Sequence, residues 1–330
     1  MNVRHASKFL RTTLAATMAS VALLMGAAGD AAAQSKPIVR VLVGFPPGSG
    51  SDSLARIYAD ALSSAINVTT VVDNRPGAGG QIAAQALKAA TADSNSIMFT
   101  VDHQVVMVPL ITKEPGFDPK KDMIPVGKIA NFYTCLVVPA SSPAKTVDEY
   151  IELARKDPNQ GSLAIPAPGS QAHFAVYVLA QRYKVNLTAA PYKGWGPAVV
   201  DLLGGNVPAG VGPCDAVNEH KKTGKLRVLA TATDRRLKMM PDVPTFAEGG
   251  LRMPADSFLA VYASTTLRQD LLRQITDATR KMFDNPATVE KIAATQMDPS
   301  YAGPDELRRL VEQNAEFWGE QVKRSQFQLQ

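Results

Sequence analysis

The sequence predicts an α/β protein built as two lobes around a ligand cleft. Short apolar runs rich in β-branched residues alternate with amphipathic helical segments, which is typical of largely parallel sheets with covered faces. The alternation occurs in two groups, and no flexible Gly/Ser-rich linker separates them. We therefore expect strands to cross between the lobes around a cleft at the carboxyl ends of strands, where open α/β folds bind ligands.

The first 33 residues have the order of a secretory signal peptide. Arg4, Lys8 and Arg11 precede an apolar run, and three alanines at residues 31–33 form a small-residue cleavage site. The run is short for a spanning helix and is diluted by Thr, Ser and Gly, which disfavours an uncleaved membrane anchor. We expect cleavage after residue 33 and a periplasmic protein.

Charge and composition argue against two classes of partner. Removing residues 1–33 takes three basic residues and one acidic residue from the formal net charge of +5 and leaves +3. No Lys/Arg run is interleaved with aromatic residues, so we expect no binding to nucleic acid. No later segment is long and apolar enough to span a bilayer, so we expect no membrane insertion after cleavage.

The first group of elements covers residues 34–132. Leu54, Ile57, Tyr58 and Leu62 fall on one face of a helix. The expected strands are 38–43, 69–72 and 97–100, and the expected helices are 52–63 and 81–90.

The second group covers residues 133–252, and residues 253–330 are expected to return to the first lobe as a mainly helical tail. In the second group we expect strands at 134–138, 162–165, 187–190, 207–211 and 226–230, and helices at 147–155, 171–183 and 197–203. In the tail we expect a strand at 258–263 and helices at 267–283 and 305–323.

Two loops that follow strands and precede helices are the strongest candidates for ligand binding. Residues 45–52 and 166–173 both contain Gly and Ser just before a predicted helix. Glycine lets the backbone approach a ligand closely, and free N–H groups at a helix start attract an anion. Helix capping by Ser is expected in any case. His173 is interpreted as a capping or packing residue because no partner for it is visible.

Cys135 and Cys214 leave two alternatives open. In an oxidising compartment they can pair, and each also lies in or near an apolar strand-like run where a free cysteine packs as a small apolar side chain.

The sequence contains no motif of catalysis or metal binding. It has no H-E-x-x-H, C-x-x-C, G-x-S-x-G or G-x-x-x-x-G-K-[ST] pattern. We therefore expect no enzyme activity, no metal and no cofactor. A competing hypothesis is a secreted hydrolase that uses Ser170 and His173, which lie three residues apart on a helix face, but no orienting acid accompanies them.

Several motifs in order along the chain resemble those of the Bug receptors, the extracytoplasmic binding proteins of tripartite tricarboxylate transporters. The two N-terminal signatures are FPPGSGSD at residues 45–52 and DNRPGAGG at residues 73–80. Further matches are GFDP at 116–119, PYKG at 191–194, DLLGG at 201–205, GKLRVLA at 224–230 and PDVPT at 241–245.

The resemblance implies a two-lobed periplasmic binding protein fold, type II-like, with the ligand enclosed between the lobes. It also implies that backbone amides of residues 45–52 and 166–173 hold a ligand carboxylate, and that the receptor delivers this ligand to the membrane subunits of a tripartite tricarboxylate transporter. The alternative function is a receptor relic that acts as a sensor or binds a partner protein. The candidate ligand-binding residues are Phe45, Pro47, Gly48, Ser49, Gly50, Ser51, Asp52, Gly79, Asp102, His103, Pro168, Gly169, Ser170, His173, Tyr192 and Asp215.

Two positions depart from the family pattern. Many members have an Asp-Asn pair after the strand expected at 207–211, where this chain has Gly-Pro-Cys-Asp at residues 212–215. Asp102 and His103 replace the small polar residues often seen after the third strand. We hypothesise that His103 favours either an anionic second group or an aromatic one in the ligand.

Overall fold

The computed structural model describes residues 36–253, 257–325 and 327. The expected signal peptide, residues 1–33, lies outside these residues. Both sheets of the protein belong to the compact unit Ile38–Gln330.

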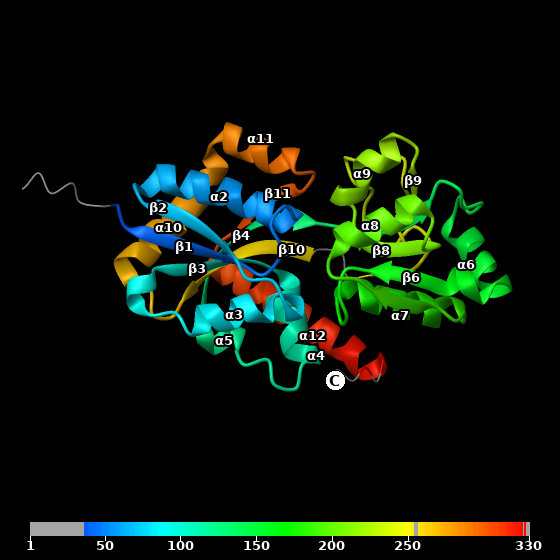
Figure 1. Ribbon diagram of the computed structural model, residues 1–330, viewed down its shortest axis with the longest axis horizontal. Coiled ribbons are helices and arrows are strands. Elements are labelled where there is room, and N and C mark those ends of the chain that lie inside the picture. Colours follow the sequence, from blue (N-terminus) through cyan, green and yellow to red (C-terminus); the bar gives the residue numbers. More distant parts are fainter. Residues whose placement is uncertain (1–35, 254–256, 326, 328–330) are drawn as a thin grey trace, which may run out of the picture. The chain divides into compact units, whose positions relative to one another are not determined.

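The described chain contains two mixed β-sheets, each covered by helices on both faces (Figure 1). We call each sheet with its helices a lobe. The sheet of the first lobe has the order β11-β4-β10-β3-β1-β2, and the sheet of the second lobe has the order β7-β6-β8-β5-β9. This arrangement confirms the predicted α/β class and two-lobed fold.

The first sheet combines parallel and antiparallel pairing. β1 pairs in parallel with β2 and β3, whereas β10 pairs antiparallel with β3 and β4, and β11 pairs antiparallel with β4. Its strands are β1 (Ile38–Val43), β2 (Thr69–Asn74), β3 (Ser96–Val101), β4 (Met123–Phe132), β10 (Ser257–Ser264) and β11 (Asp298–Ala302).

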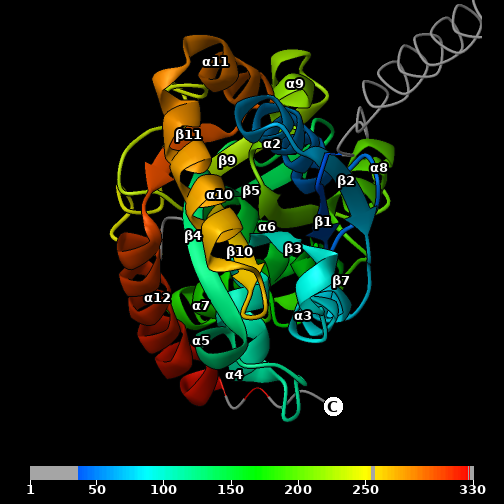
Figure 2. The ribbon, with the colours of Figure 1, turned by 90° about the vertical axis from the view of Figure 1, so that its left-hand side faces the viewer.

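Two apolar layers pack on opposite faces of the first sheet. Alternation along β1 sends Val41 into the layer formed with α2, α10 and α11, and Leu42 into the layer formed with α3, α4 and α12. Figure 2 shows α10 and α12 beside β4, which both helices contact. The helices of this lobe are α2 (Gly50–Ile66), α3 (Gln81–Lys88), α4 (Val108–Ile111), α5 (Pro119–Asp122), α10 (Gln269–Lys281), α11 (Pro286–Ala294) and α12 (Pro304–Ser325).

The second sheet is built in a similar way. β6 pairs in parallel with β7 and β8, and β5 pairs antiparallel with β8 and β9. Its strands are β5 (Thr134–Pro139), β6 (Ser162–Ile165), β7 (Thr188–Pro191), β8 (Ala209–Pro213) and β9 (Leu226–Thr231). Its helices are α6 (Val147–Lys156), α7 (Gln171–Tyr183), α8 (Trp195–Gly204) and α9 (Asp215–Lys222).

Most expected elements are present, and the missed ones have a physical explanation. β6 and α7 begin and end at the residues that the sequence predicts. β4 was not predicted, because Pro125 and Gly127 interrupt its apolar pattern, and the structure has register shifts against β10 in this strand. Five further elements were also missed, and all of them are short: α4 and α5 have four residues each, β11 has five, α9 has eight and α11 has nine.

Candidate functional site

The first candidate loop ends at a helix whose start is capped by the loop itself. Ser49 is the N-cap of α2, and its hydroxyl accepts a hydrogen bond from Asp52 N at 3.3 Å. Gly48 has a φ of +81°, a left-handed conformation that favours glycine. The Gly48 N–H donates to Asp52 Oδ2 at 2.8 Å, so the loop folds back on the first turn of its own helix.

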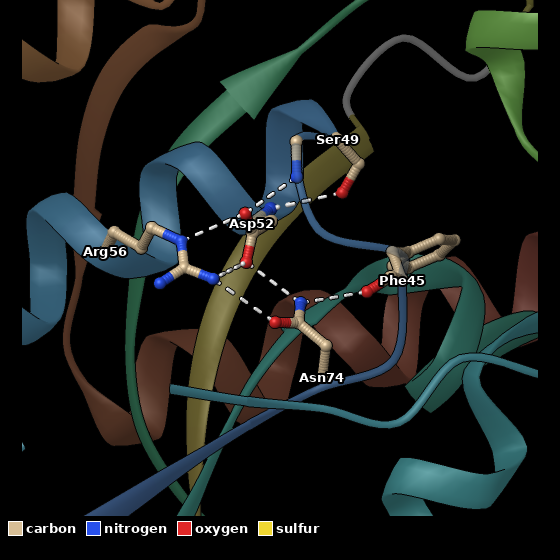
Figure 3. A network of polar contacts seen from close by, with 6 residues as sticks. Phe45, Ser49, Asp52, Arg56 and Asn74 are labelled. Carbon is tan, nitrogen blue, oxygen red and sulfur yellow. Dashed lines mark hydrogen bonds and ion pairs between the residues drawn. The ribbon is translucent and has the colours of Figure 1, made fainter. Parts of the chain in front are cut away.

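Asp52 is buried and anchors this loop through a network of polar contacts (Figure 3). Arg56 Nη2 and Asn74 Nδ2 both donate to Asp52 Oδ1, at 3.0 and 2.9 Å, and Asn74 Nδ2 also donates to the carbonyl oxygen of Phe45. Burial alone raises the pKa of Asp52, but the hydrogen bonds from Arg56, Gly48 and Asn74 outweigh it and hold that pKa below its usual value. Asp52 therefore stays ionised and positions the loop.

The second candidate loop repeats this design with a different anchor. Ser170 is the N-cap of α7 and accepts from His173 N at 3.3 Å, while the Gly169 N–H donates to His173 Nδ1 at 3.0 Å. The imidazole lies edge-on against Phe327, with ring centroids 4.8 Å apart. Burial lowers the pKa of His173, which favours the neutral ring that can accept at Nδ1.

Both loops border one cavity of about 490 Å³. Loops, strand ends and helix starts from both lobes form the wall of this cavity. A cavity with such a wall is where a ligand site is expected in an α/β fold of two lobes. The lining residues are Phe45, Pro46, Pro47, Gly48, Ser49, Gly50, Ser51, Val101, Asp102, His103, Phe132, Thr134, Pro166, Ala167, Ser170, Gln171, Ala172, Lys193, Gly194, Trp195, Gly196, Pro197, Gly212, Pro213, Asp215, Ala216, Ser257, Leu259 and Met297.

Asp102 links the two lobes inside this cavity. It is 1% exposed, its Oδ1 accepts from His103 N at 2.8 Å, and its Oδ2 accepts from Gln171 Nε2 at 2.5 Å. The other amide atom of Gln171, Oε1, accepts from Ser257 Oγ in the first lobe. Burial raises the pKa of Asp102 to about 7, although these hydrogen bonds oppose the rise.

His103 is buried at the start of a π-helical turn, His103–Met107. A Cβ placed on Gly79 would lie 2.7 Å from His103 Nε2, so glycine at this position makes room for the ring. Burial lowers the pKa of His103 to about 4 and keeps the imidazole uncharged at neutral pH. An uncharged ring adds no positive charge to the cavity, and the buried Nδ1 of His103 has no hydrogen-bond partner in the described part of the chain.

Trp195 forms an apolar wall of the cavity from the first turn of α8. Its indole Nε1 donates to the carbonyl oxygen of Pro213 at 3.1 Å, and its ring covers Gly212, where a Cβ would overlap it. Glycine in β8 is therefore needed for Trp195 to pack against the strand. Lys193 precedes this wall and makes no ion pair within the described part of the chain.

Ten of the sixteen candidate residues line the cavity, and six do not. The ten are Phe45, Pro47, Gly48, Ser49, Gly50, Ser51, Asp102, His103, Ser170 and Asp215. The six are Asp52, Gly79, Pro168, Gly169, His173 and Tyr192. Asp52, Gly79 and His173 support the loops or His103, and Tyr192 donates to Asp201 Oδ2 at 2.6 Å.

Sequence reasoning missed lining residues that come from the ends of crossing strands. Phe132 ends β4, Thr134 begins β5, and Ser257 begins β10. The available signal was the position of each beside the expected crossing between lobes. Met297, just before β11, carried no such signal.

Of the two alternatives for the cysteines, the structure shows the disulfide. Cys135 in β5 and Cys214 at the start of α9 form a disulfide, with Cα atoms 5.3 Å apart. Among the residues that the structure describes, no group of three or more His, Cys, Asp or Glu side chains is placed to hold a metal.

The geometry of Ser170 and His173 does not support the hydrolase hypothesis. Ser170 Oγ accepts from the backbone N–H of His173, and His173 Nδ1 accepts from the backbone of Gly169. A general base has to be hydrogen-bonded to the hydroxyl that it deprotonates, and these two side chains serve as caps instead.

Comparison with known proteins identifies the family. A model described as "Tripartite tricarboxylate transporter family receptor" matches residues 54–327. Protein BugT of Bordetella pertussis is 30% identical over 316 residues, which cover 94% of this chain and 97% of BugT.

Two solved structures show the same fold. The periplasmic binding protein BugD is 25% identical, with a TM-score of 0.81 over 89% of this chain and 99% of BugD. Rpa4515 of R. palustris, solved with adipate, is 28% identical, with a TM-score of 0.81 over 86% of this chain and 96% of that protein. In the described residues no helix combines the length and apolar character that crossing a membrane requires. The chain therefore belongs to the tripartite tricarboxylate transporter receptor family and has the fold of the periplasmic solute-binding proteins.

Proposed function

We propose that this chain is a periplasmic receptor that captures a small carboxylate through backbone N–H groups of its two Ser-capped loops. In this proposal it then delivers the solute to the membrane subunits of a tripartite tricarboxylate transporter. The observation that carries the proposal is that α2 and α7 both begin at the wall of one cavity.

The first turns of these helices leave N–H groups for a ligand. In α2 the first backbone hydrogen bond is donated by Ser53 N to Ser49 O. The hydroxyl of Ser49 accepts a second hydrogen bond, from Asp52 N. The N–H groups of Gly50 and Ser51 then have no acceptor within the described chain, and both residues line the cavity.

The start of α7 has the same arrangement. Phe174 N donates to Ser170 O and His173 N donates to Ser170 Oγ, so Gln171 and Ala172 keep their N–H groups for a ligand in the cavity. Helix starts attract anions because the free N–H groups and the helix dipole both favour negative charge. Adipate in the related Rpa4515 structure is a ligand of this kind and supports a carboxylic acid as the solute.

The proposal is tested by a thermal-shift screen of carboxylic acids, followed by calorimetric titration of each acid that stabilises the protein. We expect at least one acid to bind, and we expect Gly48→Val to weaken its binding about tenfold or more, because a branched side chain at the cavity wall blocks approach to the N–H groups.

Gly224→Val is the matched control. Gly224 has a φ of +70° and open space at the Cβ position, as Gly48 does, but it does not line the cavity. Equal loss of affinity in both variants would remove the first loop from the site. A protein that binds no acid in the screen would favour the alternative function as a partner-binding module.

A further inference from the structure

The described residues of the cavity wall carry more carboxyl groups than cationic side chains. Among the described residues that line it, Lys193 is the only cationic side chain, and Asp102 and Asp215 each bring a carboxyl. His103 is uncharged at neutral pH. If one ligand carboxylate is held by N–H groups at the helix starts, as proposed above, a second carboxylate meets one cation, Lys193, in a cavity that also contains the carboxyls of Asp102 and Asp215.

Asp102 is already engaged in contacts that join the two lobes. Both of its carboxyl oxygens already accept hydrogen bonds, from His103 N and from Gln171 Nε2, and its side chain is buried between the lobes. Its role is to hold Gln171 at the start of α7.

Asp215 differs from Asp102 in having an oxygen without a donor. Its Oδ1 is buried and has no hydrogen-bond partner in the described part of the chain. Its Oδ2 lies 3.5 Å from the position that a Cβ on Gly50 would take, so the carboxyl faces the start of α2.

The position of Asp215 is fixed by its neighbours in the chain. It is the first residue of α9 and follows Cys214, whose disulfide to Cys135 ties this point to β5. The N–H of Cys214 also donates to the carbonyl oxygen of Tyr133 at 2.7 Å. Backbone N–H groups of Asp215 and Ala216 already interact with this carboxyl, but a buried oxygen that still lacks a donor is a strong acceptor for one, because an unmade hydrogen bond at a buried group is costly.

We propose that the preferred solute carries one carboxylate, bound at the helix starts, and a hydroxyl or amine donor that binds Asp215, whose carboxyl faces the start of α2. This inference rests on the proposed function and narrows its ligand class from carboxylates in general to acids with a single carboxylate. The apolar surfaces of Phe45, Phe132 and Trp195 match the carbon skeleton between the two ends.

The test compares three sets of acids that differ only at the far end. The sets are butyrate, 4-hydroxybutyrate and succinate; hexanoate, 6-hydroxyhexanoate and adipate; and benzoate, 4-hydroxybenzoate and terephthalate. Calorimetric titration at pH 7.5 measures the affinity of each. In the set that binds most tightly, we expect the hydroxy acid to bind about tenfold or more tightly than both the unsubstituted acid and the diacid.

The variant Asp215→Asn tests whether the preference for the hydroxy acid depends on its hydrogen bond to the carboxyl of Asp215. An amide both donates and accepts, so we expect this variant to lose most of the tenfold preference for the hydroxy acid over the diacid, and the unsubstituted acid to keep its affinity to within about twofold. Asp93→Asn, at an exposed position away from the cavity, is the matched control and is expected to leave all affinities unchanged.

The outcomes are distinguishable. A wild-type protein that binds the diacid more tightly than the hydroxy acid, or a preference that survives in Asp215→Asn, overturns this inference and leaves the carboxylate receptor intact. A protein that binds no member of any set contradicts the proposed function itself.

Discussion

Gly48 and Gly169 occupy the same place in two loops of the same design. Both have positive φ, +81° and +63°, both precede a Ser N-cap with extended backbone, and both donate their N–H to a side chain four residues later. The surroundings differ. A Cβ on Gly48 meets open space at the cavity, whereas a Cβ on Gly169 would overlap Ile111 of the first lobe.

The difference shows that one local motif serves two purposes. The loop at 45–52 turns its glycines and prolines toward the cavity, and its anchor Asp52 is locked behind it by Arg56. The loop at 166–173 turns Gly169 and His173 toward α4 and Phe327, so it also joins the lobes. A sequence motif alone therefore does not reveal which of its residues face the ligand.

The largest effect is expected from removal of the disulfide, which lies in the second lobe alone. Cys135 and Cys214 close a chain segment of 79 residues, and the double variant Cys135→Ala/Cys214→Ala is expected to lose about 4 kcal/mol of unfolding free energy. Chemical denaturation measures the loss. Hydrogen exchange should then rise more at residues 166–173 than at 45–52, and an equal rise in both loops would contradict this expectation.

The next largest expected effect is a difference in stability loss between alanine variants of Gly48 and Gly169. Alanine at either position incurs the strain of left-handed backbone, about 1 kcal/mol, but Gly169→Ala also overlaps Ile111 and is expected to cost about 3 kcal/mol in total. Denaturant titration of both variants measures the difference. The variant Gly169→Ala with Ile111→Val should recover part of the loss, and equal destabilisation by the two alanines would break the comparison.

The capping serines are expected to behave alike. Ser49→Ala and Ser170→Ala each remove a hydroxyl that accepts one N–H of the first turn, so each should cost about 1 kcal/mol of unfolding free energy. Thermal unfolding without ligand measures both. A difference of more than about 1 kcal/mol between them would show that the two caps are not equivalent.

The smallest expected effect is a difference in pH dependence between the stability contributions of His173 and Asp52, the residues that anchor the two loops. The pKa of His173 is lowered in the folded protein from 6.5, so its contribution to stability is present above about pH 6.5 and is lost as pH falls through the folded pKa. The pKa of Asp52 is lowered from 3.8, so its contribution is lost only at more acidic pH.

Thermal unfolding between pH 7.5 and 3 checks this order. His173→Asn keeps an acceptor for the Gly169 N–H but does not titrate, and it should flatten the loss of stability just below pH 6.5. Asp52→Asn should change the profile only near and below pH 4. A His173→Asn profile that matches the wild type would show that the second anchor does not titrate on unfolding.

The sequence predicted the parts of the fold that depend on local pattern. The apolar runs and capped helices around residues 162–183 were predicted to the residue, because strand, loop and helix there each have an unbroken signal. β4 was missed although it lies inside the first sheet, because its Pro125 and Gly127 are accommodated by register shifts that only the neighbouring strands determine.

The candidate site was predicted in part for a similar reason. Loops at helix starts carry a local signal, so the residues from Pro47 to Ser51 were named as candidates, and they line the cavity. The hydrogen bonds of Gln171 with Asp102 and Ser257 join positions that are 69 and 86 residues apart. Such contacts depend on how the lobes come together, and no single-sequence pattern records them.

The chain passes from the first sheet to the second through Tyr133, because β4 ends at Phe132 and β5 begins at Thr134. The carbonyl oxygen of Tyr133 accepts from Cys214 N in the second lobe, and its hydroxyl donates to Asp298 Oδ2 in the first lobe at 2.7 Å. Any swivel between the sheets has to be absorbed by torsion angles at this crossing and along the returning stretch after β9. Because Tyr133 is hydrogen-bonded to both lobes, a swivel that changes the torsion angles at this residue has to strain or break one of these two hydrogen bonds.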